Sequence, residues 1–255
     1  MIKKWTITIP QLTGKARRRV YVYVPDEAAE FPDRRYPVLY MFDGHNVFFD
    51  SDATYGKSWG LGEYLAAANI PLIVAAVECN HSPDNGRLSE YSPFTFHNQE
   101  LGFIHGRGEI TMDWFVNTFK PRIDRRFPTL PDRKHTFIAG SSMGGLMSLY
   151  GVMAYNHVFS RAAALSPSIW FATEDLDRMI RQARIAPDTV IYMDYGSREL
   201  SFHKNMASQF RRVSGRLLEK GVMLNCRIVP YGDHCEASWQ RQIPYFIDTL
   251  LYHLE

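Results

Sequence analysis

The feature that most constrains this chain is the segment Gly140-Ser141-Ser142-Met143-Gly144, which lies between two regular patterns. Residues 136–139 form a short apolar run of strand type, and an apolar pattern with helical spacing begins at Leu146. A Gly-x-Ser-x-Gly sequence between a strand and a helix is typical of a nucleophile elbow. The glycines allow a sharp turn, so the serine hydroxyl stands at the helix N-terminus, where free N–H groups favour a developing anion. The register selects Ser142, because the pattern centred on Ser141 lacks both glycines.

Apolar runs and helical patterns alternate along the chain. Residues 5–9 and 18–24 alternate apolar and polar side chains, as antiparallel strands at a sheet edge do. Later runs are short and continuous, which is typical of parallel strands buried on both faces; they cover residues 38–42, 72–77, 136–139, 162–165, 190–193 and 224–229. Helical patterns cover residues 61–68, 110–123, 146–155, 176–183, 202–218 and 239–254. We therefore predict an α/β fold with a mostly parallel central sheet and helices on both faces.

The chain is expected to form one domain that spans residues 1–255, with no large separate cap domain. Residues 80–109 break the alternation of strand and helix and are rich in glycine, proline, serine and asparagine. We predict a long ordered loop near the site, because loops of this length in compact domains are usually functional. A surface excursion remote from the site is the alternative.

Charge and cysteine content exclude several classes of function. Lys and Arg total 29 against 27 Asp and Glu, and the net charge of +2 gives no strong field for a phosphate backbone or an anionic bilayer. No apolar run approaches the ~20 residues of a membrane span, and the first ten residues lack the apolar stretch of a signal peptide. Cys79, Cys226 and Cys235 show no Cys-x-x-Cys spacing, and His97 and His105 lack a recognised ligand spacing. We predict a cytoplasmic protein with no metal, cofactor, nucleic-acid partner or membrane partner.

A nucleophilic serine requires a histidine base that a carboxylate orients, and with this elbow the chain order is Ser, acid, His. Three histidines lie well downstream: His203, His234 and His253. His203 and His253 lie within helical patterns, whereas His234 lies in a loop after the strand at 224–229. Catalytic side chains gather in loops at the carboxyl ends of strands. His234 is therefore the predicted base, and a capping or packing histidine is the alternative.

Two carboxylates qualify as the acid after the strand at 190–193. Asp194 can still lie within the strand, whereas Glu199 follows a glycine in the loop and has the reach to face His234. Geometry favours Glu199 and leaves Asp194 as the alternative. Asp233, next to the histidine, is expected to be a turn residue that caps the last helix.

The loop Asp43-Gly44-His45-Asn46 follows the strand at 38–42. With a nucleophile elbow, this is where the second oxyanion donor lies, and the first donor is the residue after the nucleophile. The backbone N–H groups of Met143 and His45 are therefore predicted to hold the oxyanion that forms when Ser142 attacks a carbonyl.

Six segments carry a family resemblance in the same order along the chain. They are Tyr40-Met41-Phe42-Asp43-Gly44-His45-Asn46-Val47-Phe48, Arg87-Leu88-Ser89-Glu90-Tyr91-Ser92-Pro93, Gly140 to Gly145, Leu165-Ser166-Pro167-Ser168, Gly196-Ser197-Arg198-Glu199 and His234-Cys235-Glu236-Ala237-Ser238-Trp239. Together they resemble the esterase D, enterochelin esterase and mycolyltransferase group of α/β hydrolases, which includes feruloyl and acetylxylan esterases. His45 stands where that group usually has glutamine, and Cys235 where it has asparagine.

The resemblance implies an α/β-hydrolase fold with Ser142, Glu199 and His234 as the catalytic triad, and it favours Glu199 over the alternative acid. It also implies His45 and Met143 as the oxyanion donors. Members of the group act on aryl esters, acetylated sugars, siderophore lactones or glutathione thioesters, or transfer acyl groups to sugars. The resemblance therefore does not fix the substrate.

The leading hypothesis is a serine carboxylic-ester hydrolase that works through an acyl-enzyme on a small-molecule or sugar-linked ester. An acyltransferase to a sugar hydroxyl and a non-catalytic binding domain are the alternatives, and homo-oligomerisation stays open. The candidate substrate contacts are Asp43, Trp59, Arg87, Phe94, Ser166 and Trp170.

Residues 80–109 are expected to cover the site as a lid or wall. An ion pair between Arg87 and Glu90 is expected to brace this segment. Phe94 and Phe103 are expected to face the pocket and to select among acyl or alcohol groups.

Overall fold

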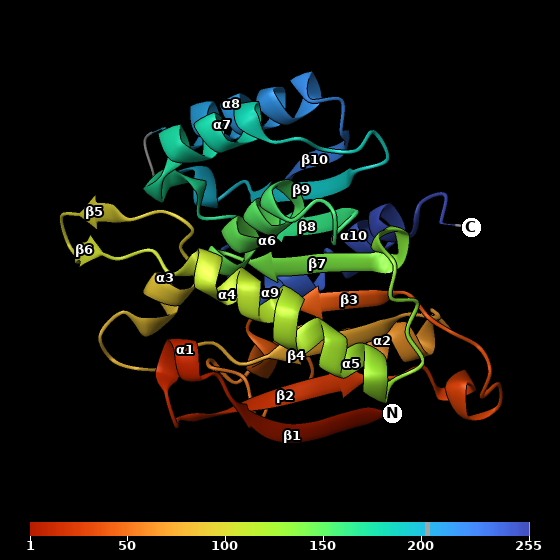
Figure 1. Cartoon of the computed structure of the whole chain (residues 1–255). Helices are drawn as coiled ribbons and strands as arrows, with labels where there is room; N and C mark the ends of the chain where they lie inside the picture. The colour runs from red at the N-terminus through yellow and green to blue at the C-terminus, as the bar shows by residue number, and fades with distance from the viewer. Residues whose placement is uncertain (202–204, 255) are drawn as a thin grey trace.

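The computed structural model describes residues 1–201 and 205–254, so His203 and the start of the helix expected over 202–218 lie outside the described residues. Within the described residues, the central sheet has eight strands in the order β1-β2-β4-β3-β7-β8-β9-β10 (Figure 1). The strands are β1 (Ile2–Thr8), β2 (Arg17–Tyr23), β3 (Val38–Met41), β4 (Ile73–Val77), β7 (Thr136–Ser141), β8 (Arg161–Leu165), β9 (Val190–Gly196) and β10 (Met223–Val229).

Strand pairing confirms the expected sheet. β3 pairs in parallel with β4 and β7, which places Leu39 opposite Val74 on one side and Phe137 on the other. The ladders from β7 through β10 are also parallel. β1 pairs antiparallel with β2, and β2 antiparallel with β4. The two opening segments thus form the expected antiparallel edge of a mostly parallel sheet.

Helices cover both faces of the sheet (Figure 1). They are α1 (Pro10–Thr13), α2 (Leu61–Ala67), α3 (Gly86–Glu90), α4 (Gly108–Trp114), α5 (Lys120–Arg126), α6 (Met143–Ala154), α7 (Thr173–Gln182), α8 (Met206–Glu219), α9 (Glu236–Gln240) and α10 (Ile243–Leu251). One hydrophobic core lies between the sheet and α4 to α8, and a second lies between the sheet and α2, α9 and α10. In the described part of the chain, none of these helices is long and apolar enough to span a bilayer.

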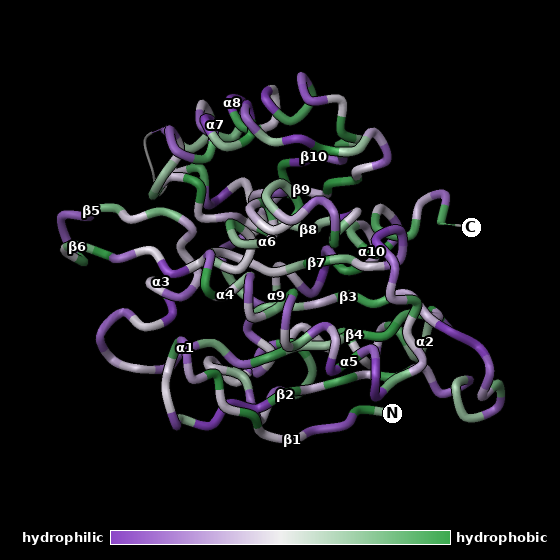
Figure 2. Tube along the Cα trace, in the orientation of Figure 1, coloured by the Kyte–Doolittle hydropathy of each residue, from purple (hydrophilic) through white to green (hydrophobic). Residues whose placement is uncertain are grey.

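Strand β3 shows how the sequence supplies both cores. Its side chains alternate between the faces, so Leu39 and Met41 enter the core shared with α2, α9 and α10, while Val38 and Tyr40 enter the core shared with α4 to α8. All four are buried, and each apolar side chain removed from water contributes about 1.5–3 kcal/mol to stability. In Figure 2, hydrophobic colour runs along the buried strand β4, whereas hydrophilic colour covers much of helix α7.

Proline interrupts two of the expected helices. The helix expected over 110–123 consists of α4, a π-helical turn over Phe115–Phe119, and α5, whose second residue is Pro121. Proline has no N–H for the i→i−4 bond and its ring crowds the preceding turn, so the helix widens there. The helix expected over 239–254 is divided into α9 and α10 for the same reason, because Pro244 is the second residue of α10.

Residues 80–109, expected as one long loop, contain regular structure. The segment includes α3 and a hairpin of β5 (Phe96–Asn98) and β6 (Gly102–Ile104), which projects away from the sheet at the left of Figure 1. Alternation over three residues is too short a pattern to predict a strand from sequence. The first part of the segment, up to Leu88, lines the cavity described below.

Candidate active site

Loops at the carboxyl ends of adjacent parallel strands bring the predicted residues to one edge of the sheet. His45 follows β3, Ser142 follows β7 and Ser166 follows β8. Glu199 follows β9, and His234 follows β10. Residues that are far apart in sequence therefore share one edge because the strands that precede them are neighbours in the sheet.

The turn between β7 and α6 holds Ser142 in a conformation that L-residues rarely adopt, with φ 58° and ψ −122°. A Cβ atom on Gly140 would lie 2.7 Å from the carbonyl carbon of Gly144, so this close crossing of strand and helix requires glycine. The Ser142 N–H donates to the Leu165 carbonyl at 2.9 Å, which stabilises the turn. The Ser142 hydroxyl lies at the N-terminus of α6, 3.3 Å from Ser168 Oγ.

Glu199 and His234 are in direct contact. His234 Nδ1 lies 2.7 Å from Glu199 Oε2. The other carboxylate oxygen, Oε1, accepts hydrogen bonds from the Ser166 hydroxyl at 2.6 Å and from the Gly196 N–H at 2.8 Å. The Ser166 hydroxyl in turn accepts a bond from Trp239 Nε1 at 3.0 Å. Both carboxylate oxygens of this buried side chain therefore have partners, and the carboxylate is fixed against the imidazole.

Asp194, the alternative acid, lies within β9 and faces other partners. Its carboxylate accepts hydrogen bonds from the Tyr192 hydroxyl at 2.7 Å and from the Ser166 N–H at 3.1 Å. Burial raises the pKa of Asp194 to about 7, and the nearby charge of Glu199 also raises it. The acid within β9 and the acid in the loop after it thus have different environments, and Glu199 is the one that contacts His234.

Replacing Asp194 with asparagine is expected to reduce the dependence of stability on pH between about pH 4 and pH 7. In this window the folded state keeps the Asp194 proton while the unfolded chain, with an ordinary pKa near 4, has lost it. The free energy of unfolding therefore falls as pH rises, by up to about 4 kcal/mol from this group. Urea unfolding at several pH values measures how the free energy of unfolding changes with pH. Equal slopes for the wild type and Asp194→Asn would contradict the expectation.

The loop after β3 carries His45, one of the two predicted oxyanion donors, and the other, Met143, is the first residue of α6. Asp43 adopts the left-handed conformation with φ 53° and begins the turn that carries His45. Arg87 Nε and Nη2 donate to the two Asp43 carboxylate oxygens at 2.8 and 2.7 Å. Burial raises the pKa of Asp43, but the Arg87 guanidinium outweighs this and holds the pKa below its usual range. His45 and Met143 lie in the first turn of their helical segments, where backbone N–H groups lack an acceptor within the helix, so both N–H groups suit the predicted role.

The expected ion pair between Arg87 and Glu90 is wrong. Arg87 pairs with Asp43, and the Glu90 carboxylate accepts bonds from Arg18 Nη1 and Nη2 at 2.6 and 2.7 Å. Arg18 lies on β2 and Asp43 in the loop after β3, so each charge of α3 is neutralised by a residue outside this helix. Two bidentate pairs of this kind fix the position of α3 at the edge of the sheet.

A cavity of about 660 Å³ opens at this edge of the sheet. Its walls include His45, Arg87, Ser142 and His234, together with most of residues 79–88. Glu199 is buried behind His234. The first part of the segment expected as a lid therefore forms a wall of the cavity that contains the elbow serine.

The two phenylalanines expected to face this cavity lie elsewhere. Phe94 packs edge-on against Tyr150 and lines a second, separate cavity. Phe103 lies in the projecting hairpin, 59% exposed, with its ring against His105. The hairpin carries the second half of the segment away from the sheet (Figure 1).

The two predicted tryptophan contacts lie behind and beside the site. Trp59 is buried in the core against Trp239, with ring centroids 6.0 Å apart. Trp170 is partly exposed, and its ring centroid lies 6.3 Å from that of His234. Trp170 therefore flanks the histidine, whereas Trp59 supports it through Trp239, whose centroid lies 5.1 Å from the His234 ring.

Sequence reasoning did not identify two residues that contact the site. Ser168 lies within hydrogen-bond distance of the Ser142 hydroxyl, and Trp239 donates to the Ser166 hydroxyl that holds Glu199. Both lie in segments that carry the family resemblance, so the sequence did contain a signal for these two residues. Their roles depend on contacts between β8, β9 and α9, which sequence spacing does not reveal.

Residues 13–249 match the family model described as "Putative esterase". A relative from Bacillus subtilis (strain 168), named "Uncharacterized protein YbbA", is 25% identical over 212 residues, which cover 80% of this chain and 79% of the relative. The siderophore triacetylfusarinine C esterase of Aspergillus fumigatus is 23% identical over 135 residues, which cover 53% of this chain and 45% of that protein.

A solved structure with a similar fold is the IroE-like serine hydrolase from Shewanella oneidensis, with a TM-score of 0.75 and 18% identity. The match covers 97% of this chain and 79% of that one. At this level of identity the likeness concerns the fold alone.

Proposed function

The chain belongs to the esterase family, a family of carboxylic ester hydrolases, and we propose that it works through an acyl-enzyme formed on Ser142. In this proposal His234 is the general base and Glu199 orients it. The backbone N–H groups of His45 and Met143 hold the oxyanion.

The observation that carries this proposal is the 2.7 Å contact between Glu199 and His234 Nδ1. A carboxylate on Nδ1 selects the tautomer in which Nε2 is unprotonated, so Nε2 can accept the proton of a serine hydroxyl. Ser142 and His234 line the same cavity, which supports the proposal that the hydroxyl and its base act on one bound ester. In the described residues Ser142 Oγ is paired with Ser168; a bound substrate would draw it towards the base, since catalytic hydrogen bonds often tighten only in the complex.

The proposed reaction has two half-reactions. His234 takes the Ser142 proton as Oγ attacks the ester carbonyl, and the two N–H groups stabilise the resulting oxyanion by several kcal/mol. His234 then protonates the leaving alcohol, which leaves the acyl group on Ser142. Water, deprotonated by His234, attacks the acyl-enzyme and releases the acid.

The cavity favours a polar small-molecule ester. Its wall carries Lys57, Asn80, Asn85 and Arg87, which offer hydrogen-bond donors to a carbohydrate, hydroxamate or phenolic substituent. The Aspergillus relative is named as an esterase of a siderophore, so siderophore esters belong in the substrate panel with acetylated sugars and feruloyl esters. We further propose a reducing, cytoplasmic location, which suits the three free cysteines.

Labelling with an alkyl fluorophosphonate tests the nucleophile directly. The reagent is expected to form one adduct per chain, and peptide mass spectrometry should place it on Ser142, because this hydroxyl lies at the turn between β7 and α6, beside the proposed N–H donors. Prior incubation with an ester that the enzyme hydrolyses should slow the labelling. An adduct on Ser141, or none on an active preparation, would contradict the assignment.

Product analysis distinguishes hydrolysis from acyl transfer. With an activated ester and a large excess of a sugar acceptor, a hydrolase is expected to release free acid as its main product. Acylated sugar as the main product would instead support the acyltransferase alternative. Ester binding without turnover would support a non-catalytic domain.

A further inference from the structure

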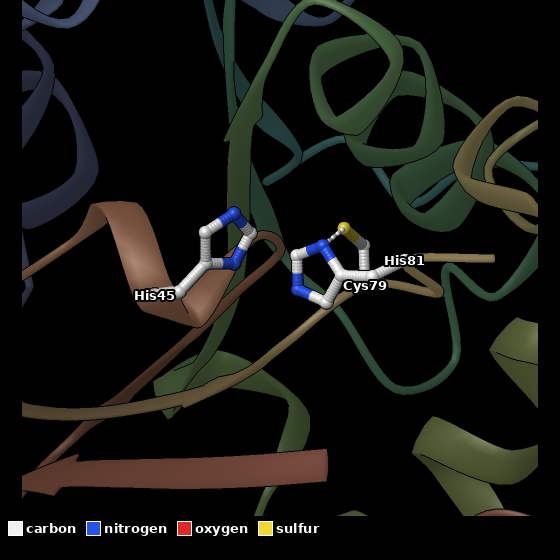
Figure 3. Close-up of side chains that lie close together, drawn as sticks. All are labelled: His45, Cys79 and His81. Carbon is white, nitrogen blue, oxygen red and sulfur yellow. Dashed lines mark hydrogen bonds between the residues drawn. The ribbon is translucent and has the colours of Figure 1, made fainter. Parts of the chain in front are cut away.

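Three potential metal ligands meet on the wall of the cavity. Each of His45, Cys79 and His81 offers one ligand atom, and these atoms lie within 4.8 Å of one another. Figure 3 shows the two imidazole rings next to each other, with centroids 4.7 Å apart in an edge-to-face arrangement and the Cys79 sulfur beside His81. All three residues line the cavity that contains Ser142.

The His45 imidazole has one ring nitrogen in a hydrogen bond and one that can bind a cation. The residue is only 3% exposed, and its Nε2 lies 3.0 Å from Thr54 Oγ1. Its other nitrogen, Nδ1, is buried and has no hydrogen-bond partner among the described residues. If Nε2–H donates to Thr54, Nδ1 carries a free lone pair, and a buried lone pair without a partner is costly unless something binds it. Binding of a cation at Nδ1 removes that cost.

The second histidine lies beside the thiol and near a carboxylate. His81 Nδ1 lies 3.9 Å from the sulfur of the buried Cys79, and its Nε2 lies 3.9 Å from the Glu78 carboxylate. The Glu78 carboxylate accepts a hydrogen bond from Arg19 Nε at 2.6 Å, so its negative charge, rather than a hydrogen bond, favours a cation at His81. The side chain of His81 is 55% exposed, so it can rotate towards the other two ligands. Bringing the three ligand atoms to zinc bond lengths of about 2.0–2.3 Å requires them to move closer by only about 1 Å.

We propose that His45, Cys79 and His81 bind a borderline-soft divalent cation of the zinc type, with the fourth coordination position open to the cavity. Two imidazole nitrogens and one thiolate form a ligand set that suits Zn²⁺ and does not suit Mg²⁺ or Ca²⁺. On binding, two metal–nitrogen bonds and one metal–sulfur bond form, and the Cys79 thiol proton leaves to solvent.

A bound ion at this site inhibits ester hydrolysis, a consequence that rests on the proposed function. The His45 backbone N–H is a proposed oxyanion donor, and the ion on the same residue's side chain would lie in the wall next to that donor. A bound ion offers the substrate carbonyl or a water molecule a competing position, so occupancy inhibits ester hydrolysis. Binding itself does not depend on this consequence.

Direct titration of the metal-free, full-length chain with Zn²⁺ in competition with a chromogenic chelator tests the binding. We expect one tight equivalent per chain in the wild type, and a loss of affinity of about 100-fold or more in Cys79→Ser and in His81→Ala, since even the loss of an outer-shell partner costs 10–100-fold. His81 is exposed, so its variant keeps the test valid if a change at the buried cysteine impairs folding. Cys226→Ser is the matched control for a free thiol outside the cavity.

Cobalt identifies the ligand. Co²⁺ should give a sulfur-to-metal charge-transfer absorption that disappears in Cys79→Ser and persists in Cys226→Ser and Cys235→Ser. Cys235 is the informative comparison, because it lies next to His234 in the same cavity. No tight equivalent, or a signal that depends on Cys235, would overturn the proposal.

Hydrolysis assays then test the inhibitory role of the ion separately from its binding. Zn²⁺ is expected to inhibit the wild type and to have at least tenfold less effect on Cys79→Ser. Inhibition that is equal in both proteins would overturn the inhibitory role. If no ester is hydrolysed, the proposed function fails while the titration still decides the metal site.

Discussion

Replacement of Ser142 with alanine is expected to lower kcat/KM for ester hydrolysis by about 10⁴-fold or more. The substitution removes only Oγ, whose hydrogen-bond partner among the described residues is Ser168. Alanine and serine have the same Cβ, so the left-handed backbone at this turn is strained to the same degree in both. The variant should therefore keep its fold and the oxyanion donors and lose only the nucleophile.

The measurement is kcat/KM on a p-nitrophenyl ester, with thermal unfolding recorded in parallel. Ser168→Ala is the matched control, because it removes the hydrogen bond to the same hydroxyl without removing the hydroxyl. One neutral hydrogen bond contributes about 0.5–1.5 kcal/mol, so the control should lose about tenfold at most. Equal losses in the two variants, or wild-type activity in Ser142→Ala, would refute an acyl-enzyme on Ser142.

The features that could be predicted from sequence are those that local patterns encode. The strands were recognisable because continuous apolar runs such as that of β4 bury both faces. The elbow was recognisable because its close crossing demands glycine at Gly140 and Gly144. The positions of Glu199 and His234 followed from the same reasoning, since parallel strands bring the loops after their carboxyl ends together.

The features that could not be predicted depend on which side chains meet across the fold. Arg87 and Glu90 are three residues apart on α3, a spacing that suggests a pair. Their partners are instead Asp43, 44 residues away, and Arg18, 72 residues away. A buried carboxylate needs a cation beside it, and the fold supplies Arg18 of β2 to Glu90 and Arg87 of α3 to Asp43.

The cluster of His45, Cys79 and His81 is a second example. The sequence predicted no metal, because metal motifs are recognised by short spacings and these ligands come from two separate loops. β3 and β4 are parallel neighbours, so the loops after them emerge side by side and bring the three side chains together. The orphaned Nδ1 of His45 is visible only once burial is known.

Replacement of Glu199 with glutamine is expected to lower kcat by about 10³–10⁴-fold with little effect on folding. The glutamine carbonyl can accept the bonds from Gly196 and Ser166, which turns its NH₂ group towards His234 Nδ1. An NH₂ donor there requires Nδ1 to be unprotonated, so the proton moves to Nε2 and the imidazole can no longer act as the base. In a serine protease, the corresponding change of acid to amide lowers kcat about 10⁴-fold through this wrong tautomer.

Asp194→Asn provides the matched control for Glu199→Gln. Both variants replace a buried carboxylate that interacts with Ser166, but only Glu199 contacts His234. The control is expected to retain kcat within about tenfold, because the Asp194 carboxylate accepts from Tyr192 and Ser166 and does not reach the imidazole. A kcat loss confined to Asp194→Asn would reverse the assignment of the acid, and equal small losses in both would mean that His234 acts without a carboxylate. A selective loss in Glu199→Gln is the outcome that a triad of Ser142, His234 and Glu199 requires.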